Sequence, residues 1–115
     1  MYIDTHCHYN TAQFDEDLDD AIDRASSSGI SKSIVVGFDM PSSLRAVELA
    51  HSRPSLYAAI GIHPCDCQSW NGDAEKWLRD SADDPKVVAI GEIGLDYYRG
   101  GREDKDQVDV QESVL

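Results

Sequence analysis

The stretch KSIVVGF, residues 32–38, decides the fold class of this 115-residue chain. Its apolar residues follow one another without the alternation that marks a strand with one face in water. A continuous apolar run of this length is typical of a strand buried on both faces, as in a parallel sheet covered by helices. SLYAAIGIHP at residues 55–64 is predicted as another buried strand, and KVVAIGEIG at residues 86–94 as a further strand. The sequence therefore predicts a sheet that contains these three strands.

Segments with apolar residues at helical spacing separate the predicted strands. YIDTH at residues 2–6 is predicted as a short first strand, and residues 14–29 as the first helix. Residues 40–54 contain the second helix, because Pro41 suits its first turn and Pro54 lies beyond its end. A third helix is marked by Trp70, Ala74, Trp77 and Leu78 and ends before Pro85, and residues 107–115 resemble the start of a fourth.

Strict alternation of strands and helices, in units of about 25–30 residues, predicts a parallel α/β sheet with right-handed crossover connections. Two architectures fit, a doubly wound sheet and half of a (β/α)8 barrel, and alternation alone does not separate them. No G-x-G-x-x-G motif follows the first predicted strand, which disfavours the nucleotide-binding form of the doubly wound sheet. In both architectures active groups gather at the carboxyl ends of strands. The polar residues predicted at such ends are His6, His8, Asp39, His63 and Glu92.

His6 and His8 stand one residue apart at the end of the first predicted strand. Because side chains alternate across a strand, both imidazoles point to the same face, with Cα atoms roughly 6.5–7 Å apart. Imidazoles at that spacing can share one cation at N–metal distances of about 2.0–2.1 Å; otherwise they are ordinary polar residues at a strand end. Asp4 lies on the same face and could orient one imidazole or accept a hydrogen bond behind it. Cys7 faces the other way, toward the helices, and is a poor ligand candidate.

Glu92 follows an apolar run, at a place where a carboxylate is costly to bury without a partner. A nearby cation would remove that cost, whereas a solvent-exposed strand end would explain the residue without a metal. The same two interpretations stay open for Asp96. His63 is a third imidazole near the cation, a donor to substrate, or a strand-end histidine stabilised by local carbonyls.

The formal net charge of −12 comes from 22 acidic residues against 10 lysines and arginines. Such a surface repels polyanions at long range, so a phosphate-bearing substrate needs a local positive charge, such as a bound metal. Arg99 and Arg102 are candidates for a phosphate contact or for a solvated, charged loop. No apolar run approaches the ~20 residues of a membrane span and no signal-peptide pattern is present, so we predict a cytoplasmic protein without membrane contact. The three cysteines, Cys7, Cys65 and Cys67, are predicted to be reduced thiols.

Three segments together resemble the TatD-type family of metal-dependent hydrolases: DTHCH at residues 4–8, GIHP at residues 61–64 and GEIGLDYYR at residues 91–99. The resemblance spans essentially the whole chain, in the family's order and spacing. It implies a (β/α)8 barrel of the TIM type with one or two divalent ions, Mg²⁺, Mn²⁺ or Zn²⁺, at its carboxyl-end mouth. It also implies deoxyribonuclease activity on DNA, often as a 3′→5′ exonuclease. By position, the implied metal ligands are His6, His8 and Glu92, and the catalytic candidates are Glu92, His63 and Asp96.

The resemblance further implies that the chain covers only part of a barrel. A domain of this fold runs to about 250 residues, and the family's further ligands, two histidines and an aspartate, come from later strands. We therefore expect residues 1–115 to be the N-terminal part of one hydrolase barrel, truncated to about four βα units, whose partner is the missing C-terminal half. A half barrel exposes its first and fourth strands as parallel edges, which invites self-association. In isolation we expect weak metal binding and little or no nuclease activity.

Two other functions remain open from the sequence. A related amidohydrolase-like enzyme would use the same metal chemistry on an ester or amide bond. A half barrel could also bind metal without catalysis. Assays on single-stranded DNA and on small esters separate the two enzymes, and a metal titration addresses the third hypothesis.

Overall fold

A computed structural model gives the structure of the chain, and it describes residues 1–99 and 105–115. Strands and α-helices alternate along the chain, as the sequence predicts, and two short 3-10 helices are inserted between them. The strands are β1 (Tyr2–Cys7), β2 (Ile30–Val36), β3 (Leu56–Ile60) and β4 (Val87–Ile90). The helices are η1 (Ala12–Phe14), α1 (Leu18–Ser27), α2 (Met40–Ser52), η2 (Pro64–Ser69), α3 (Gly72–Ser81) and α4 (Lys105–Val114).

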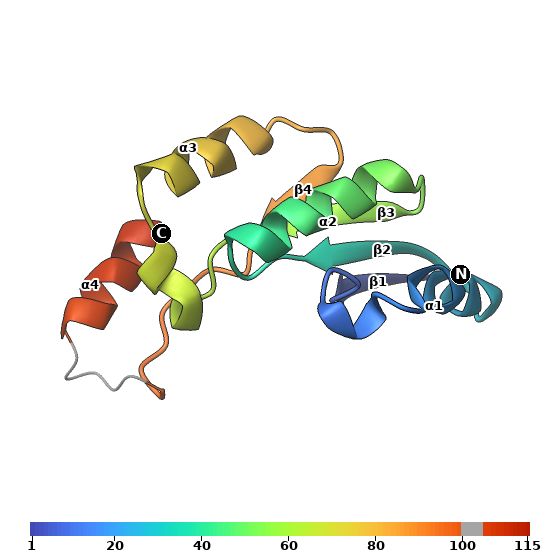
Figure 1. Cartoon of the computed structure of the whole chain (residues 1–115), viewed down its shortest axis with the longest axis horizontal. Helices are drawn as coiled ribbons and strands as arrows, with labels where there is room; N and C mark the ends of the chain where they lie inside the picture. Colours follow the sequence, from blue (N-terminus) through green and yellow to red (C-terminus); the bar gives the residue numbers. More distant parts are fainter. Residues whose placement is uncertain (100–104) are drawn as a thin grey trace.

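The four strands form one sheet in the order β1-β2-β3-β4, and every neighbouring pair is parallel. This confirms the parallel sheet that the apolar runs predict. The strand arrows point toward the end of the molecule where η2 and α4 lie (Figure 1). All residues that follow strand ends therefore lie at one edge of the sheet, where α/β proteins build their sites.

The hydrophobic core lies between the central strands and helix α2. Val35 in β2, Ile60 in β3 and Ala46 in α2 are each 0% exposed, and α2 runs along β2 and β3 (Figure 1). Asp39 begins α2 with a capping box, because its Oδ1 accepts from the Ser42 backbone N at 2.8 Å while the Ser42 Oγ accepts from the Asp39 backbone N at 3.0 Å. Asp39, the polar residue predicted at the end of the second strand, therefore caps the N-terminus of α2.

Several predicted elements are shorter in the structure than in the sequence prediction. β3 ends at Ile60 and β4 at Ile90, so His63 and Glu92 lie in the loops beyond the strands. Pro64 opens the 3-10 helix η2, which separates β3 from α3. Trp70 caps the end of η2 and lies outside α3. Proline has no backbone N–H to donate to a neighbouring strand, so the third strand cannot continue through residue 64.

The outer strands β4 and β1 expose apolar side chains, as expected for the first and fourth strands of a half barrel. Val88 and Ile90 are each 49% exposed, and on β1 Tyr2 is 69% and Ile3 is 55% exposed. Among the described residues β4 pairs only with β3 and β1 only with β2, so both strands are edges. Apolar edges of this kind are templates for pairing with another chain.

We expect a second copy of the chain to cover these edges at high concentration. Sedimentation equilibrium should show reversible self-association, and the double variant Val88→Lys with Ile90→Lys should weaken it by at least about tenfold, because charge on an exposed edge opposes strand pairing. Leu44→Lys, at a 44% exposed position on α2, is the matched control. A monomer at every concentration, or unchanged association of the double variant, would contradict this prediction.

No helix in residues 1–99 or 105–115 combines the length and the apolar character that crossing a membrane requires.

Candidate metal centre

Three side chains from opposite edges of the sheet meet at its carboxyl end. His6 lies in β1, His8 directly follows β1, and Glu92 follows β4. The Nε2 atoms of His6 and His8 are 3.3 Å apart, and the His6 Nε2 lies 3.7 Å from the Glu92 Oε1. One ligand atom from each residue lies within 4.8 Å of the other two. We call this group the His6–His8–Glu92 cluster.

The spacing of the cluster fits the donor set of a divalent cation. Ligand atoms at 2.0–2.1 Å from a tetrahedral ion stand about 3.3–3.4 Å from one another. The two imidazole nitrogens match that separation, and the carboxylate oxygen is only slightly farther from the His6 nitrogen. Imidazole nitrogen and carboxylate oxygen together admit Mg²⁺, Mn²⁺ or Zn²⁺.

The His8 ring is oriented by the backbone of the neighbouring strand. Its Nδ1 lies 3.0 Å from the carbonyl oxygen of Val36. A carbonyl can only accept, so Nδ1 carries the proton and Nε2 presents its lone pair toward His6 and Glu92. This orienting carbonyl is invisible in the sequence, because it depends on the pairing of β1 with β2.

Glu92 is held in place by backbone contacts to two other strand ends. Its N–H donates to the Gly37 carbonyl at 2.9 Å, and the Gly91 N–H donates to the Ile60 carbonyl at 2.9 Å. A Cβ on Gly61 would lie 2.6 Å from the Glu92 carbonyl oxygen and 2.7 Å from the Gly91 carbonyl carbon. Only glycine therefore fits at position 61. Its signal in the sequence is an isolated glycine within an apolar run, which marks close backbone approach.

Asp4 and Cys7, which flank His6, lie outside the cluster. The Asp4 Oδ1 accepts from the backbone N of His6 at 3.1 Å, so this contact is to the main chain and not to an imidazole. Cys7 packs against the hydrophobic core, as predicted, and its thiol donates to the Ile34 carbonyl at 3.3 Å. Burial raises the pKa of the Cys7 thiol to about 11, which leaves it protonated and a poor ligand at neutral pH.

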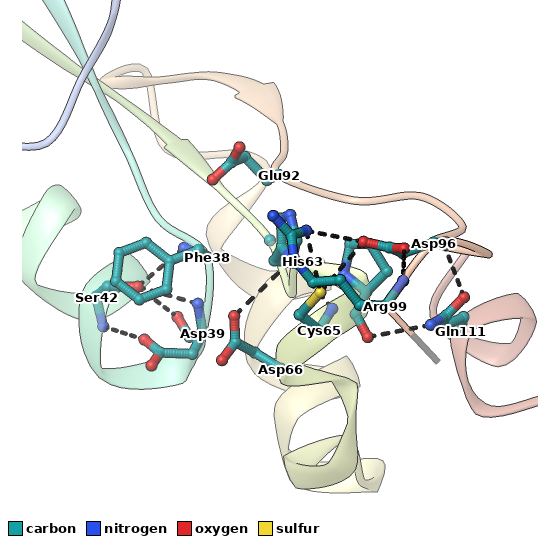
Figure 2. Close-up of polar contacts among 12 residues, drawn as sticks. Phe38, Asp39, Ser42, His63, Cys65, Asp66, Glu92, Asp96, Arg99 and Gln111 are labelled. Carbon is teal, nitrogen blue, oxygen red and sulfur yellow. Dashed lines mark hydrogen bonds and ion pairs between the residues drawn. The ribbon is translucent and has the colours of Figure 1, made fainter. Parts of the chain in front are cut away.

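His63 lies at the same end of the sheet as Glu92 (Figure 2), but it is not one of the three residues that form the cluster. Its Nδ1 accepts from the Cys65 backbone N at 3.0 Å and stands 3.9 Å from the Asp66 Oδ2. The imidazole therefore caps η2. A catalytic role for His63 stays a prediction.

Asp96 closes the loop that follows Glu92. Its Oδ1 accepts from the backbone N–H groups of Tyr98 at 2.8 Å and Arg99 at 2.9 Å, and its Oδ2 accepts from the Arg99 Nη1 at 2.9 Å. These contacts, with the Arg99 backbone bond first and the Cys65 thiol next, lower the pKa of Asp96 from 3.8 to about 2. A catalytic role for Asp96 stays a prediction, and Arg102 lies outside the described residues.

We expect Asp96 to make unfolding pH-dependent at acid pH. Because its pKa is about 2 in the folded protein and ordinarily 3.8, the unfolded chain takes up the proton first as the pH falls. Its stabilising contribution is therefore present above about pH 4 and is lost between about pH 4 and pH 2. Urea unfolding midpoints should fall over that window in the parent and fall less in Asp96→Asn. Parallel curves for the two proteins would contradict this prediction.

Gln111 joins the loop to two helices and has no signal in the sequence. This α4 side chain is 2% exposed; its Oε1 accepts from the Asp96 backbone N at 2.9 Å and its Nε2 donates to the Pro64 carbonyl at 3.3 Å (Figure 2).

The two cysteines of the C-x-C pair differ in their burial. Cys67 is buried in the core, whereas Cys65 is exposed and donates to the Asp96 Oδ2 at 3.3 Å. All three cysteines are free thiols, as predicted.

Comparisons of the chain with protein families and with known proteins agree on one group of relatives. The family model described as TatD related DNase matches residues 3–115. The chain is 41% identical over 115 residues to the uncharacterized metal-dependent hydrolase YabD of Bacillus subtilis, covering all of this chain and 44% of that protein. It is 36% identical over 96 residues to the 3′-5′ ssDNA/RNA exonuclease TatD of Cronobacter turicensis, covering 84% of this chain and 36% of that protein.

A solved structure shares the fold. The crystal structure of YjjV, a TatD homologue from Escherichia coli, superimposes with a TM-score of 0.84 at 34% identity, covering 99% of this chain and 43% of that chain. The chain thus spans less than half the length of these relatives, and its four parallel strands with their helices form part of a (β/α)8 barrel of the TIM type. On its sequence and its fold, the chain belongs to the TatD-related DNase family.

Proposed function

We propose that this chain supplies the amino-terminal metal ligands of a hydrolase that cleaves phosphodiester bonds in nucleic acid. The observation that carries the proposal is the convergence of His6, His8 and Glu92 on one point at the carboxyl end of the sheet. The names of its relatives, a metal-dependent hydrolase and a 3′-5′ ssDNA/RNA exonuclease, support both the metal and the substrate class.

In this proposal the His6–His8–Glu92 cluster holds one or two divalent ions, Mg²⁺, Mn²⁺ or Zn²⁺. A bound ion would act as a Lewis acid on the phosphoryl oxygens and lower the pKa of bound water toward about 7. The chain's own residues position the donors: the Val36 carbonyl orients His8, and the Gly37 carbonyl holds Glu92. Local positive charge is needed, because a protein of net charge −12 otherwise repels a phosphate.

We propose further that residues 1–115 are the N-terminal part of a single barrel. Three ligands leave the coordination shell of a divalent ion incomplete, so further protein groups, water or substrate fill the remaining positions. Single-stranded DNA is the substrate we favour, with digestion from the 3′ end, because the exonuclease relative carries that activity in its name.

A chimeric protein tests this function. Residues 1–115 are joined to the C-terminal part of the Cronobacter turicensis exonuclease and assayed on 5′-labelled single-stranded DNA. We expect release of nucleotides from the 3′ end that depends on Mg²⁺ or Mn²⁺. Glu92→Gln should slow this release by at least about a hundredfold, because the amide is a weaker metal donor than the carboxylate.

Glu75→Gln in the same chimera is the control, because Glu75 pairs with Arg79 on α3, away from the cluster. A folded, metal-binding chimera that hydrolyses small esters but not DNA would replace the nuclease by the ester or amide hydrolase. Unchanged hydrolysis by Glu92→Gln would contradict the assignment of the cluster.

A further inference from the structure

Positive charge is scarce at the carboxyl end of the sheet. Each strand is connected to the following α-helix by a described segment, at residues 8–17, 37–39, 61–71 and 91–99. Arg99 is the only lysine or arginine in these four segments. The other described arginines and lysines lie on other helices, strands or connections. Among these connections Arg99 therefore offers a polyanion the one described cation, and Lys105, which begins α4, follows them in the chain.

The Arg99 guanidinium is fixed and still reaches solvent. Its Nη1 donates to the Asp96 Oδ2 at 2.9 Å and contacts the Cys65 Sγ at 3.5 Å. The Asp96 side chain is 13% exposed, whereas that of Arg99 is 66% exposed. The carboxylate thus lies inward and the guanidinium outward, so that less conformational entropy is lost when Arg99 binds an anion.

The loop that contains Arg99 lies at the same end of the sheet as the His6–His8–Glu92 cluster. The Cys65 backbone N donates to the His63 Nδ1, and the His63 backbone N donates to the Phe38 carbonyl at 2.7 Å. Figure 2 shows Glu92, His63 and Arg99 at this end, with the Arg99 side chain extending from the loop toward Cys65. The guanidinium is therefore connected through Cys65 and His63 to Phe38, whose ring packs edge-on against that of His8.

Tyr98 precedes Arg99 and is 94% exposed. Its backbone N donates to the Asp96 Oδ1 at 2.8 Å, so the carboxylate that pairs with Arg99 also holds the main chain at Tyr98. An exposed aromatic residue next in sequence to an arginine is a combination suited to single-stranded nucleic acid, because bases can stack on the ring while phosphates pair with the cation.

We infer that Tyr98 and Arg99 form the contact that holds a single nucleic-acid strand beside the His6–His8–Glu92 cluster. Arg99 pairs with a backbone phosphate, and Tyr98 stacks on a base without reading its identity. This inference rests on the proposed function and adds to it two substrate-positioning residues.

The test uses NMR titration of the ¹⁵N-labelled 115-residue chain with a short oligothymidylate in Mg²⁺, a method that detects millimolar affinities. We expect saturable shifts of the amides of residues 97–99 together with those of His8 and Glu92. Arg99→Gln should weaken binding about tenfold and reduce the slope of log K against log salt by about 0.7, the value for one phosphate contact on a single strand.

Tyr98→Ala should weaken binding about tenfold, whereas Tyr98→Phe, which keeps the ring, should bind like the parent. Arg79→Gln is the matched control, because Arg79 on α3 also pairs with a carboxylate at 2.9 Å and is 77% exposed. Arg99→Lys should keep the salt slope, since it keeps the charge. If Arg99 only stabilised the loop, its replacement would change the urea unfolding midpoint and leave the salt slope of binding unaltered.

Shifts at His8 and Glu92 without shifts at residues 97–99, or an unchanged salt slope in Arg99→Gln, would overturn the inference and leave the proposed function standing. The absence of saturable shifts anywhere in the chain would also overturn it. The proposed function fails separately, if the chimera described above does not hydrolyse DNA.

Discussion

Replacing His8 with alanine is expected to weaken divalent-metal binding by more than about a hundredfold, since losing even an outer partner of a ligand costs about 10- to 100-fold. The variant removes one of the two nitrogens that stand 3.3 Å apart, and with it the donor that the Val36 carbonyl orients. Calorimetric titration of the parent and the variant with Mn²⁺ at neutral pH measures the effect. Glu92→Gln should act in the same direction.

His51→Ala is the control for this titration. His51 is an exposed residue of α2, and its Nε2 pairs with the Asp84 Oδ2 at 2.6 Å, outside the cluster. Its replacement should leave the metal affinity unchanged. Equal Mn²⁺ affinity in the parent and in His8→Ala would remove His8 from the site, and equal loss in His51→Ala would show that the binding is nonspecific.

Replacing Gly61 with alanine should damage both stability and metal binding. The new Cβ would lie 2.6 Å from the Glu92 carbonyl oxygen and 2.7 Å from the Gly91 carbonyl carbon, and these are backbone atoms that move only with the loop. We expect a loss of about 1–3 kcal/mol in the free energy of unfolding, the usual cost of overpacking. Mn²⁺ affinity should fall at least about tenfold, because Glu92 moves away from the imidazoles.

Gly72→Ala is the matched control, because a Cβ at that position meets no atom within 4 Å. Gly72 opens α3, where alanine should be neutral or stabilising by up to about 1 kcal/mol. Urea unfolding and Mn²⁺ titration compare the three proteins. If Gly61→Ala unfolds at the parent's urea concentration and keeps its metal affinity, the close packing of residue 61 against the Glu92 loop does not position the ligand.

Part of the site follows from local pattern. His6 and His8 share a face because strand side chains alternate, and the structure places their Nε2 atoms together. The same alternation correctly directs Cys7 toward the core. The expectation that Glu92 approaches the two imidazoles is confirmed in its geometry, although metal binding itself stays a prediction.

Other residues have roles that local pattern does not reveal. Asp39 follows a strand like the cluster residues, but its carboxylate caps α2. Asp96 lies in the same motif as Glu92, yet it accepts from its own loop. Both carboxylates find backbone N–H donors two or three residues away, and such local bonds compete with any role at a shared site.

The sequence by itself determined the order of strands and helices, the parallel sheet and the common face of the two histidines, because these depend on the spacing of apolar and polar residues along a few turns or one strand. Only the tertiary structure decided how close Glu92 comes to them, that the Val36 carbonyl orients His8, and which backbone atoms leave no room for a Cβ at residue 61. These features depend on strand register and on backbones that approach from distant parts of the chain. Such contacts form only when the sheet assembles, so no short stretch of sequence encodes them.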